Sequence, residues 1–204
     1  IKFEGNYKDG KPVGKHNYWH ENGQKSSKSN YKDGDLFGTH IVWSENGQVV
    51  IEENYKDDKP DGKLTYWYEN NQIEREENYK DDKKDGKLTY WYVNGQIKSE
   101  GKVEDGARNG KWTFWHENGQ IKLEATFKDD KPDGKWHWWN NKGQKDEVSI
   151  YKDGDLVNKN LFKYYDNDQI KSDRNYKDDK PDGKWTWWNN KGQKDEVSIY
   201  KDGD

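Results

Sequence analysis

Cysteine and methionine are absent from the 204-residue chain, and proline occurs only four times. Without cysteine, the chain can hold neither a disulfide nor a cysteine-ligated metal, and it has no thiolate nucleophile. The lack of cysteine is compatible with a cytosolic protein and with an exported one. No apolar run approaches the roughly 18 residues that a membrane-spanning helix needs.

Aliphatic side chains are also scarce, but aromatic ones are not. Only 28% of the residues are hydrophobic, yet 15% are aromatic. Low hydrophobicity together with high net charge indicates disorder, and disordered chains are poor in aromatic residues. Here 36 basic and 40 acidic residues nearly cancel to a net charge of -4. We therefore expect a folded chain, and the lack of a basic block argues against nucleic acid as a partner.

A repeat of about 24 residues organises the whole chain into a single array spanning residues 1–204. Each copy begins with a Tyr-Lys-Asp-like step, continues with Gly seven residues later and Trp five residues after that, and closes with Gln. The residues that start successive copies are Tyr7, Tyr31, Tyr55, Tyr79, Val103, Phe127, Tyr151 and Tyr176.

The end of the array carries a duplication. Residues 128–155 and 177–204 are identical except for His137 and Thr186, which indicates that a two-copy block was duplicated. The chain stops inside a turn at Asp204 without an atypical final copy. Because repeat arrays usually need polar capping copies, we expect the chain to be part of a longer protein.

Each copy predicts two strands and two turns. In the third copy, residues 63–68 are β-branched and aromatic and are bounded by Gly62 and Asn70, as in a strand. Residues 72–79 predict the partner strand, and neither segment shows a 3.6-residue period. The predicted fold is all-β: an elongated, twisted, open-ended array of antiparallel β-hairpins.

The residue before each closing Gln is always Gly, Asn or Asp, which are the residues that tolerate positive φ. Lys142 and Lys191 occur one residue earlier, so a type I′ turn is disfavoured. We predict a type I turn followed by a left-handed residue in a G1 bulge. The Asp-rich turn at the other end of the hairpin repeats this pattern, for example at Gly10 and Asp58.

The seventh copy departs from the repeat. Asn158 replaces its Gly, its first strand holds one extra residue, and Tyr164 takes the place of the Trp one residue late. An extra residue in one strand of a pair predicts a β-bulge and a local bend.

The predicted turn pairs Trp67 with Ile73, and side-chain alternation then places Tyr79 on the same face. We interpret this face as the core. The second face is also aromatic, and packing and partner binding both stay open for it, because large aromatic stripes are typical of interaction sites. The candidate binding residues on it are Tyr66, Tyr90, Trp112, Phe114, Trp136, Trp138, Trp185 and Trp187.

The segment from Glu4 to Lys11, followed by Gly14-Lys15 and the segment from Tyr18 to Gln24, resembles the bacterial MORN-repeat variant. Proteins of that kind are often described as antitoxin components of toxin–antitoxin modules. The resemblance covers essentially the whole chain. It implies an elongated antiparallel β-array that contacts proteins or membrane lipids.

No catalytic pattern stands out in the sequence, such as Gly-x-Ser-x-Gly, a P-loop or His-Glu-x-x-His. We therefore expect neither enzymatic activity nor a cofactor. His16 and His20 would lie about 13 Å apart on a strand, too far to share a metal. Residues 57–62 are Asp-rich enough to suggest calcium, but lysines interleave and Asp and Gly are ordinary turn formers, so we interpret them as a turn.

The leading hypothesis is a non-enzymatic scaffold that binds another protein, a toxin among the candidates, in a bacterial cytoplasm or cell envelope. The alternative is a cell-surface or cell-wall module whose aromatic rings stack on glycans or choline-like ligands. Membrane-lipid contact also stays open, as does edge-to-edge self-association through the end strands of the array.

The array should be rod-like in solution. Two strands per copy at ~4.8 Å each give a length of about 75–80 Å for eight copies. Small-angle scattering should report a maximum dimension near this value. A compact particle with a radius of gyration near 17 Å, the size typical of a globular chain of about this length, would show that the copies do not stack linearly.

Overall fold

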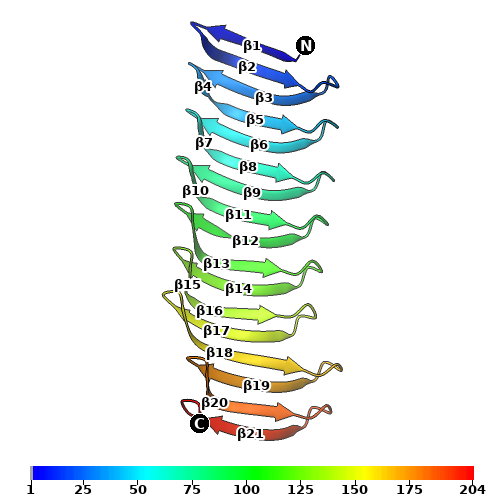
Figure 1. Ribbon diagram of the computed structural model, residues 1–204, viewed down its shortest axis with the longest axis vertical. Helices are drawn as coiled ribbons and strands as arrows, with labels where there is room; N and C mark the ends of the chain where they lie inside the picture. Colours follow the sequence, from blue (N-terminus) through cyan, green and yellow to red (C-terminus); the bar gives the residue numbers. More distant parts are fainter. Residues whose placement is uncertain (1) are drawn as a thin grey trace. The chain divides into compact units, whose positions relative to one another are not determined.

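The computed structural model describes residues 2–204, which form 21 β-strands and no helix (Figure 1). This described part of the chain therefore has no helix that is long and apolar enough to cross a membrane. The predicted all-β class with antiparallel hairpins is confirmed. The chain divides into two compact units, the first ending at Ala107 and the second beginning at Arg108.

The strands before the division are β1 (Phe3–Lys8), β2 (Lys11–Trp19), β3 (Lys25–Lys32), β4 (Asp35–Leu36), β5 (Gly38–Trp43), β6 (Val49–Lys56), β7 (Lys59–Pro60), β8 (Gly62–Trp67), β9 (Ile73–Lys80), β10 (Lys83–Lys84), β11 (Gly86–Trp91) and β12 (Ile97–Glu104). The remaining strands are β13 (Ala107–Trp115), β14 (Ile121–Lys128), β15 (Lys131–Pro132), β16 (Gly134–Trp139), β17 (Lys145–Lys152), β18 (Asp155–Tyr164), β19 (Ile170–Lys177), β20 (Lys180–Trp188) and β21 (Lys194–Tyr200).

A typical copy consists of a long strand, a tight turn, a two-residue strand and a six-residue strand. The long strand β9 leads into the two-residue β10 and then into β11. Within each unit, antiparallel pairing joins strands that are close in the sequence, such as β8 with β9 and β16 with β17. The two kinds of turn lie at opposite ends of the strands (Figure 1).

The turn before each closing Gln has the predicted three-residue form. Asn71 has a φ of 65°, and its N–H donates to the carbonyl of Tyr68 at 3.0 Å. The N–H of Tyr68 donates to the carbonyl of Gln72 at 2.8 Å, which closes the hairpin. Asp168 takes the same left-handed conformation, with a φ of 65°. The prediction of positive φ at this position is therefore confirmed for both non-glycine residues.

The Asp-rich turn is tighter than predicted. Lys80 pairs directly with Lys83, which leaves only Asp81 and Asp82 in the loop. Both have positive φ, 49° and 68°, as a type I′ turn requires. The left-handed residue that the sequence pattern predicted here is present, but the loop has two residues and not three. Asp tolerates this conformation because its short polar side chain bonds to nearby backbone.

A glycine kink separates the two-residue strand from the strand that follows it. Gly86 has a φ of 110°, and the β ladder is interrupted at Asp85. Asn78 bridges the interruption: its carbonyl accepts from the N–H of Asp85, and its Nδ2 donates to the carbonyl of Lys87, both at 2.8 Å. The equivalent side-chain bonds join Asn30 to Thr39, Asn54 to Lys63 and Asn175 to Lys184. At these four positions the Asn before the Tyr-Lys step thus satisfies backbone groups that the kink would leave unpaired.

The seventh copy lacks this kink. Strand β18 runs without a break, and Val157 is bulged out between the pairs that Leu156 and Asn158 make with β17. The predicted β-bulge is therefore confirmed, whereas the predicted bend stays a prediction. Tyr164 pairs with Ile170, as Trp67 does with Ile73, so Tyr164 holds the Trp position as predicted.

A second bulge, beside the Gln turn, decides which side chains share a face. Tyr66 pairs with Arg75, and the next residue, Trp67, pairs with Ile73. β9 therefore contains one residue more than β8 between the two pairs. An extra residue reverses the alternation of side chains along the strand that carries it.

The predicted core face is consequently wrong. Tyr79 pairs with Gly62 and lies on the face of Leu64, not on the face of Trp67 and Ile73. Leu64 is only 4% exposed, whereas Trp67 is half-buried. We call the face of Leu64 and Tyr79 the core face, and the face of Trp67 the outer face.

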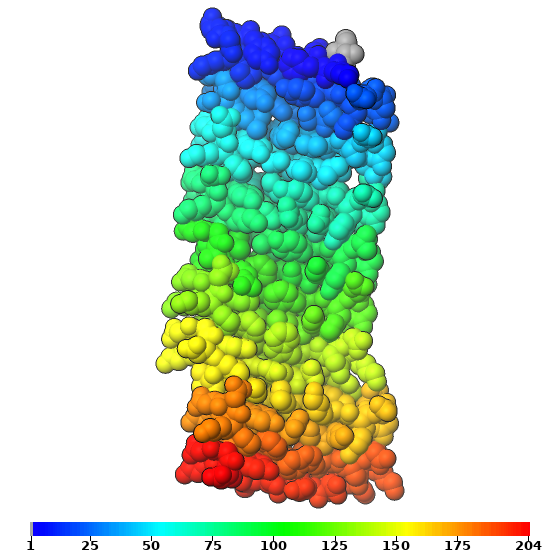
Figure 2. All heavy atoms as spheres, in the orientation of Figure 1, coloured from blue at the N-terminus to red at the C-terminus, as the bar shows by residue number. Residues whose placement is uncertain are grey.

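Side chains from successive copies form a continuous column on the core face of each unit. The column contains pairs of neighbouring aromatic rings. The ring centroids are 4.8 Å apart for His16 and Tyr31 and 4.7 Å apart for Trp136 and Tyr151. The most buried apolar residues include Trp112, 3% exposed. Side chains of neighbouring strands fill the spaces between the ribbons (Figure 2). Packing between copies therefore buries a core within a single sheet.

The left-handed turn can be tested at Gly119, whose φ is 82°. Gly119→Val should destabilise the protein by about 1–2 kcal/mol, because a β-branched residue is strained in this region. Asn71→Gly is the matched control and should be neutral or mildly stabilising. Urea denaturation measures both changes, and an unchanged stability for Gly119→Val would contradict the requirement for a left-handed residue.

Candidate binding surfaces

All eight predicted binding residues lie on the core face. Each of them occupies the position of Leu64 in its own copy or lies two residues after that position. Two of them, Trp112 and Trp136, are 3% and 9% exposed and belong to the core column. They do not present their rings to solvent, so the prediction that they contact a partner has no support in their placement. Trp185 stacks in the same column, 4.6 Å from Tyr200, and is half-buried.

In each unit, the remaining predicted residues form a second line of side chains, two residues closer to the Gln turn. All of them are half-buried, and their role in binding stays a prediction. We call them the aromatic row: Tyr66 and Tyr90 in the first unit, and Phe114, Trp138 and Trp187 in the second. Trp138 and Trp187 lean on the column, 6.0 Å from Trp136 and 5.7 Å from Trp185.

A network of polar contacts around a buried glutamate lies beside the aromatic row in the third copy. The sequence pattern did not predict this network. Glu77 is 1% exposed and forms ion pairs with Arg75 at 3.5 Å and Lys84 at 3.0 Å. The hydroxyl of Tyr79 donates to Glu77 at 3.0 Å, and the guanidinium of Arg75 lies 3.7 Å from the Tyr66 ring centroid. Burial, and then the charge of Glu77, raise the pKa of Tyr79. The network keeps the Tyr79 hydroxyl protonated, and its Arg75 packs against one face of the Tyr66 ring.

The second copy has a related network. The Tyr55 hydroxyl donates to Glu53 at 2.6 Å, and His40 lies 3.8 Å from the same carboxylate. The neighbouring His40 is the largest cause of the lowered pKa of Glu53. The carboxylates of Glu53 and Glu77 at this point of the core face therefore contact neighbouring side chains of the protein itself.

Polar side chains link successive copies along the edge that carries the Gln turns. The Tyr68 hydroxyl donates to the carbonyl of Trp91, and the Asn70 amide donates to that of Val93, both at 2.8 Å. These bonds satisfy backbone carbonyls at the turns.

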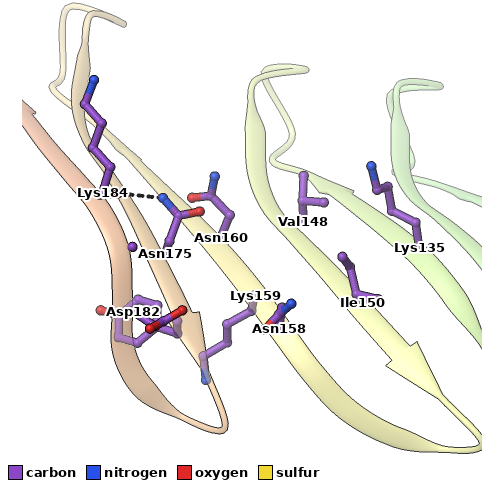
Figure 3. Close-up of a pocket in the computed structure, with 11 residues that line it drawn as sticks. Lys135, Val148, Ile150, Asn158, Lys159, Asn160, Asn175, Asp182 and Lys184 are labelled. Atoms are coloured by element: carbon purple, nitrogen blue, oxygen red, sulfur yellow. Dashed lines mark hydrogen bonds between the residues drawn. The ribbon is translucent and has the colours of Figure 1, made fainter. Parts of the chain in front are cut away.

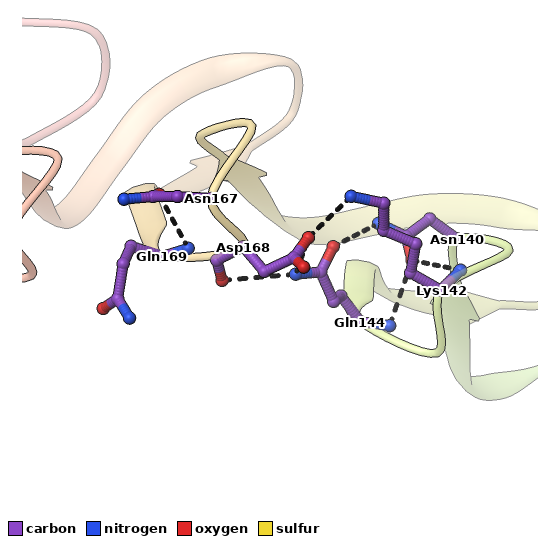
Figure 4. Close-up of polar contacts among 6 residues, drawn as sticks. All are labelled: Asn140, Lys142, Gln144, Asn167, Asp168 and Gln169. Carbon is purple, nitrogen blue, oxygen red and sulfur yellow. Dashed lines mark hydrogen bonds and ion pairs between the residues drawn. The ribbon is translucent and has the colours of Figure 1, made fainter.

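Where a lysine replaces the turn Asn, a different set of bonds makes the same link. Lys142 pairs with Asp168 at 2.7 Å, and the amide of Gln144 donates to the Asp168 carbonyl at 3.2 Å (Figure 4). Asp168 thus combines the left-handed turn conformation with a charge that neutralises Lys142. The polar side chains at this edge therefore contact the turns of neighbouring copies.

Histidine and acidic side chains form no metal site here. Within residues 2–204, no group of three or more His, Asp or Glu side chains lies close enough together to hold a metal ion. His16 is 1% exposed and bonds to the carbonyl of Asn6 at 2.9 Å, and His20 bonds to that of Trp43 at 2.9 Å. These histidines complete backbone hydrogen bonding.

The outer face carries one groove, with a cavity volume of about 450 Å³, among the pockets of the described residues. It crosses strands β16 to β20 in the second unit, from Lys135 to Lys184 (Figure 3). Its floor includes Val148, Asn160 and Asn175. The sequence carries a signal for the groove that the repeat comparison missed: Val148 stands where the three preceding copies have Glu.

The hairpin array and the packing between copies define a β-repeat protein. Six segments match the model of the MORN repeat variant: residues 12–33, 38–57, 60–81, 84–105, 108–129 and 158–178. They cover more than half of the chain, so the chain belongs to the MORN repeat variant family. Repeats of this family generally act as non-catalytic scaffold or binding modules. No curated protein matches the sequence.

The two faces should differ in their response to truncation. Trp112→Ala should cost roughly 3–5 kcal/mol of stability, because the ring is enclosed in the core column. Trp115→Ala, three residues away on the half-buried outer face, should cost less. Thermal melting of both variants measures the difference. A larger loss for Trp115→Ala would contradict the face assignment.

Proposed function

We propose that this chain is a non-enzymatic repeat scaffold whose aromatic row binds another protein. The observation that carries the proposal is the recurrence of a half-buried ring at one position of successive copies, as at Tyr66 and Tyr90. Neighbouring copies place these side chains about 10 Å apart, so one partner surface can contact several at once. Aromatic side chains that are held in place by packing are typical anchors of protein interfaces.

The orientation of the rings favours a protein over a sugar or a choline-like ligand. The Trp138 ring is tilted 48° against Trp136, and Trp187 is tilted 60° against Trp185. The guanidinium of Arg75 covers one side of Tyr66. Stacking on a sugar or caging a quaternary ammonium needs open ring faces. Tilted and partly covered rings instead offer edges, which suit packing against protein side chains.

The resemblance to antitoxin-type bacterial proteins supports a toxin as the first partner to test. A scaffold of this kind would bind the toxin without altering it chemically. The glycan- or choline-binding alternative makes a different prediction. In that case the chain should bind to a glycan or choline column when no partner protein is present.

The partner can be sought by using the full chain as bait in a lysate of the organism that encodes it. Trp138→Ala should weaken the captured partner by about 30-fold or more, because truncating a central aromatic anchor costs at least ~2 kcal/mol. Calorimetry with the purified partner measures this change.

Trp139→Ala is the matched control, since Trp139 is the next residue and lies on the outer face. It should leave the affinity for the partner unchanged, and melting curves should show that both variants are folded. Equal weakening by the two variants would contradict the aromatic row as the interface. Retention of the chain on a choline or glycan column, with no protein captured, would favour the alternative.

A further inference from the structure

The outer face carries the same ion pair across three consecutive hairpins. The lysine that follows the glycine kink pairs with a Glu on the next strand. The three pairs are Lys63 with Glu76 at 2.6 Å, Lys87 with Glu100 at 2.8 Å and Lys111 with Glu124 at 2.5 Å. Each lysine charge is thereby compensated within its own copy.

The duplicated block breaks this pattern. Val148 faces His137, and Val197 faces Thr186, at the positions where those three copies place the Glu. Lys135 and Lys184 therefore lack the cross-strand Glu and have a valine in its place. Burial, followed by the charges of Lys145 and Lys135, lowers the pKa of His137, and the charge of Glu124 opposes this effect.

The seventh copy opens a groove between these two lysines. Its extra residue places Lys159 opposite Tyr176 and turns it to the core face, where it forms an ion pair with Asp179. Asn160 then occupies the outer-face position that carries a lysine in neighbouring copies. A short side chain replaces a long one, and the space that it leaves is the groove (Figure 3).

The lining of the groove combines two terminal lysines with a polar and apolar floor, and its carboxylate, that of Asp182, lies away from the ends of the two lysine side chains (Figure 3). Figure 3 shows Lys135 and Lys184 at its two ends, with Val148 and Asn160 between them. The Asn160 Oδ1 is buried, and no group within residues 2–204 donates a hydrogen bond to it. An unsatisfied buried acceptor is costly, so a ligand that brings an N–H group would gain a hydrogen bond there.

We infer that this groove docks an extended acidic segment of a partner protein, with carboxylates at Lys135 and Lys184 and a backbone N–H at Asn160. The inference rests on the proposed protein-binding function and names the chemistry of a second contact. From β16 to β20 there are four strand spacings, or about 19 Å. An extended peptide covers this distance in about six residues. Two acidic residues at that separation match the two lysines.

The test uses the full chain and a seven-residue peptide. The peptide has Glu at both ends, and the five residues between them are drawn from Thr, Val and Gln. The control peptide carries Gln at both ends. Amide chemical shifts of the isotope-labelled protein should move around the groove with the acidic peptide, and its affinity should fall as salt is added. Equal binding of the two peptides would overturn the proposal.

Val148→Glu and Val197→Glu restore the carboxylates that the other copies carry. Each should weaken the acidic peptide about two- to fivefold, the range expected for one exposed ion pair. Lys135→Gln and Lys184→Gln should do the same and keep the test informative if a Glu variant does not fold. Lys87→Gln, in a copy whose lysine is already paired, is the matched control and should have no effect. Unchanged affinity in the groove variants would overturn the proposal.

Two further outcomes separate the groove from the aromatic row and from other ligands. If the captured partner is lost with Trp138→Ala but retained at full affinity with Val148→Glu, the aromatic row stands and the groove proposal fails. If an oligomer of galacturonic acid binds with the same dependence on Lys135 and Lys184 while the peptide does not, the groove takes an acidic sugar and the proposal is overturned.

Discussion

The bulge beside each Gln turn is the constraint on which the arrangement of side chains depends. One extra residue on the second strand of each hairpin reverses the side-chain alternation after the turn, as the pairs of Tyr66 with Arg75 and Trp67 with Ile73 show. The Tyr at the far end of the strand therefore joins the face of Leu64. Every later feature follows from this choice, including the stacked column, the enclosed Trp112 and the exposure of lysines on the opposite face.

The turn chemistry could be predicted from the sequence because it depends on single residues. Only Gly, Asn and Asp precede the closing Gln, and the positive φ of Asn71 and Asp168 follows from that restriction. The face assignment could not be predicted from side-chain alternation alone. The extra residue beside the Gln turn has no sequence signature, because Ile73 and Glu74 are ordinary strand residues. The kink at Gly86 was likewise visible as an invariant spacing but not as a break in the ladder.

The candidate surfaces were partly legible in the sequence. The aromatic positions were correctly grouped on one face, but burial separates them: Trp136 lies in the column and Trp138 beside it. Buried rings and half-buried rings have the same spacing and chemistry in the sequence, so only packing distinguishes them. The groove depends on replacements such as Val148 for Glu, which carry information only once the Lys–Glu pairs of the other copies are known.

The bonds between copies run from a side chain of one turn to a backbone carbonyl of the next, as from Asn70 to Val93. Because every peptide unit supplies such a carbonyl, a complete copy can be gained or lost by unequal recombination without leaving a donor unmatched. Residues 128–155 and 177–204 are nearly identical, which is the pattern that such an event would leave. A single inserted residue has a different effect, since it turned Lys159 away from its neighbours' face. Selection can therefore change the number of copies freely, whereas changes of one residue create new local surfaces.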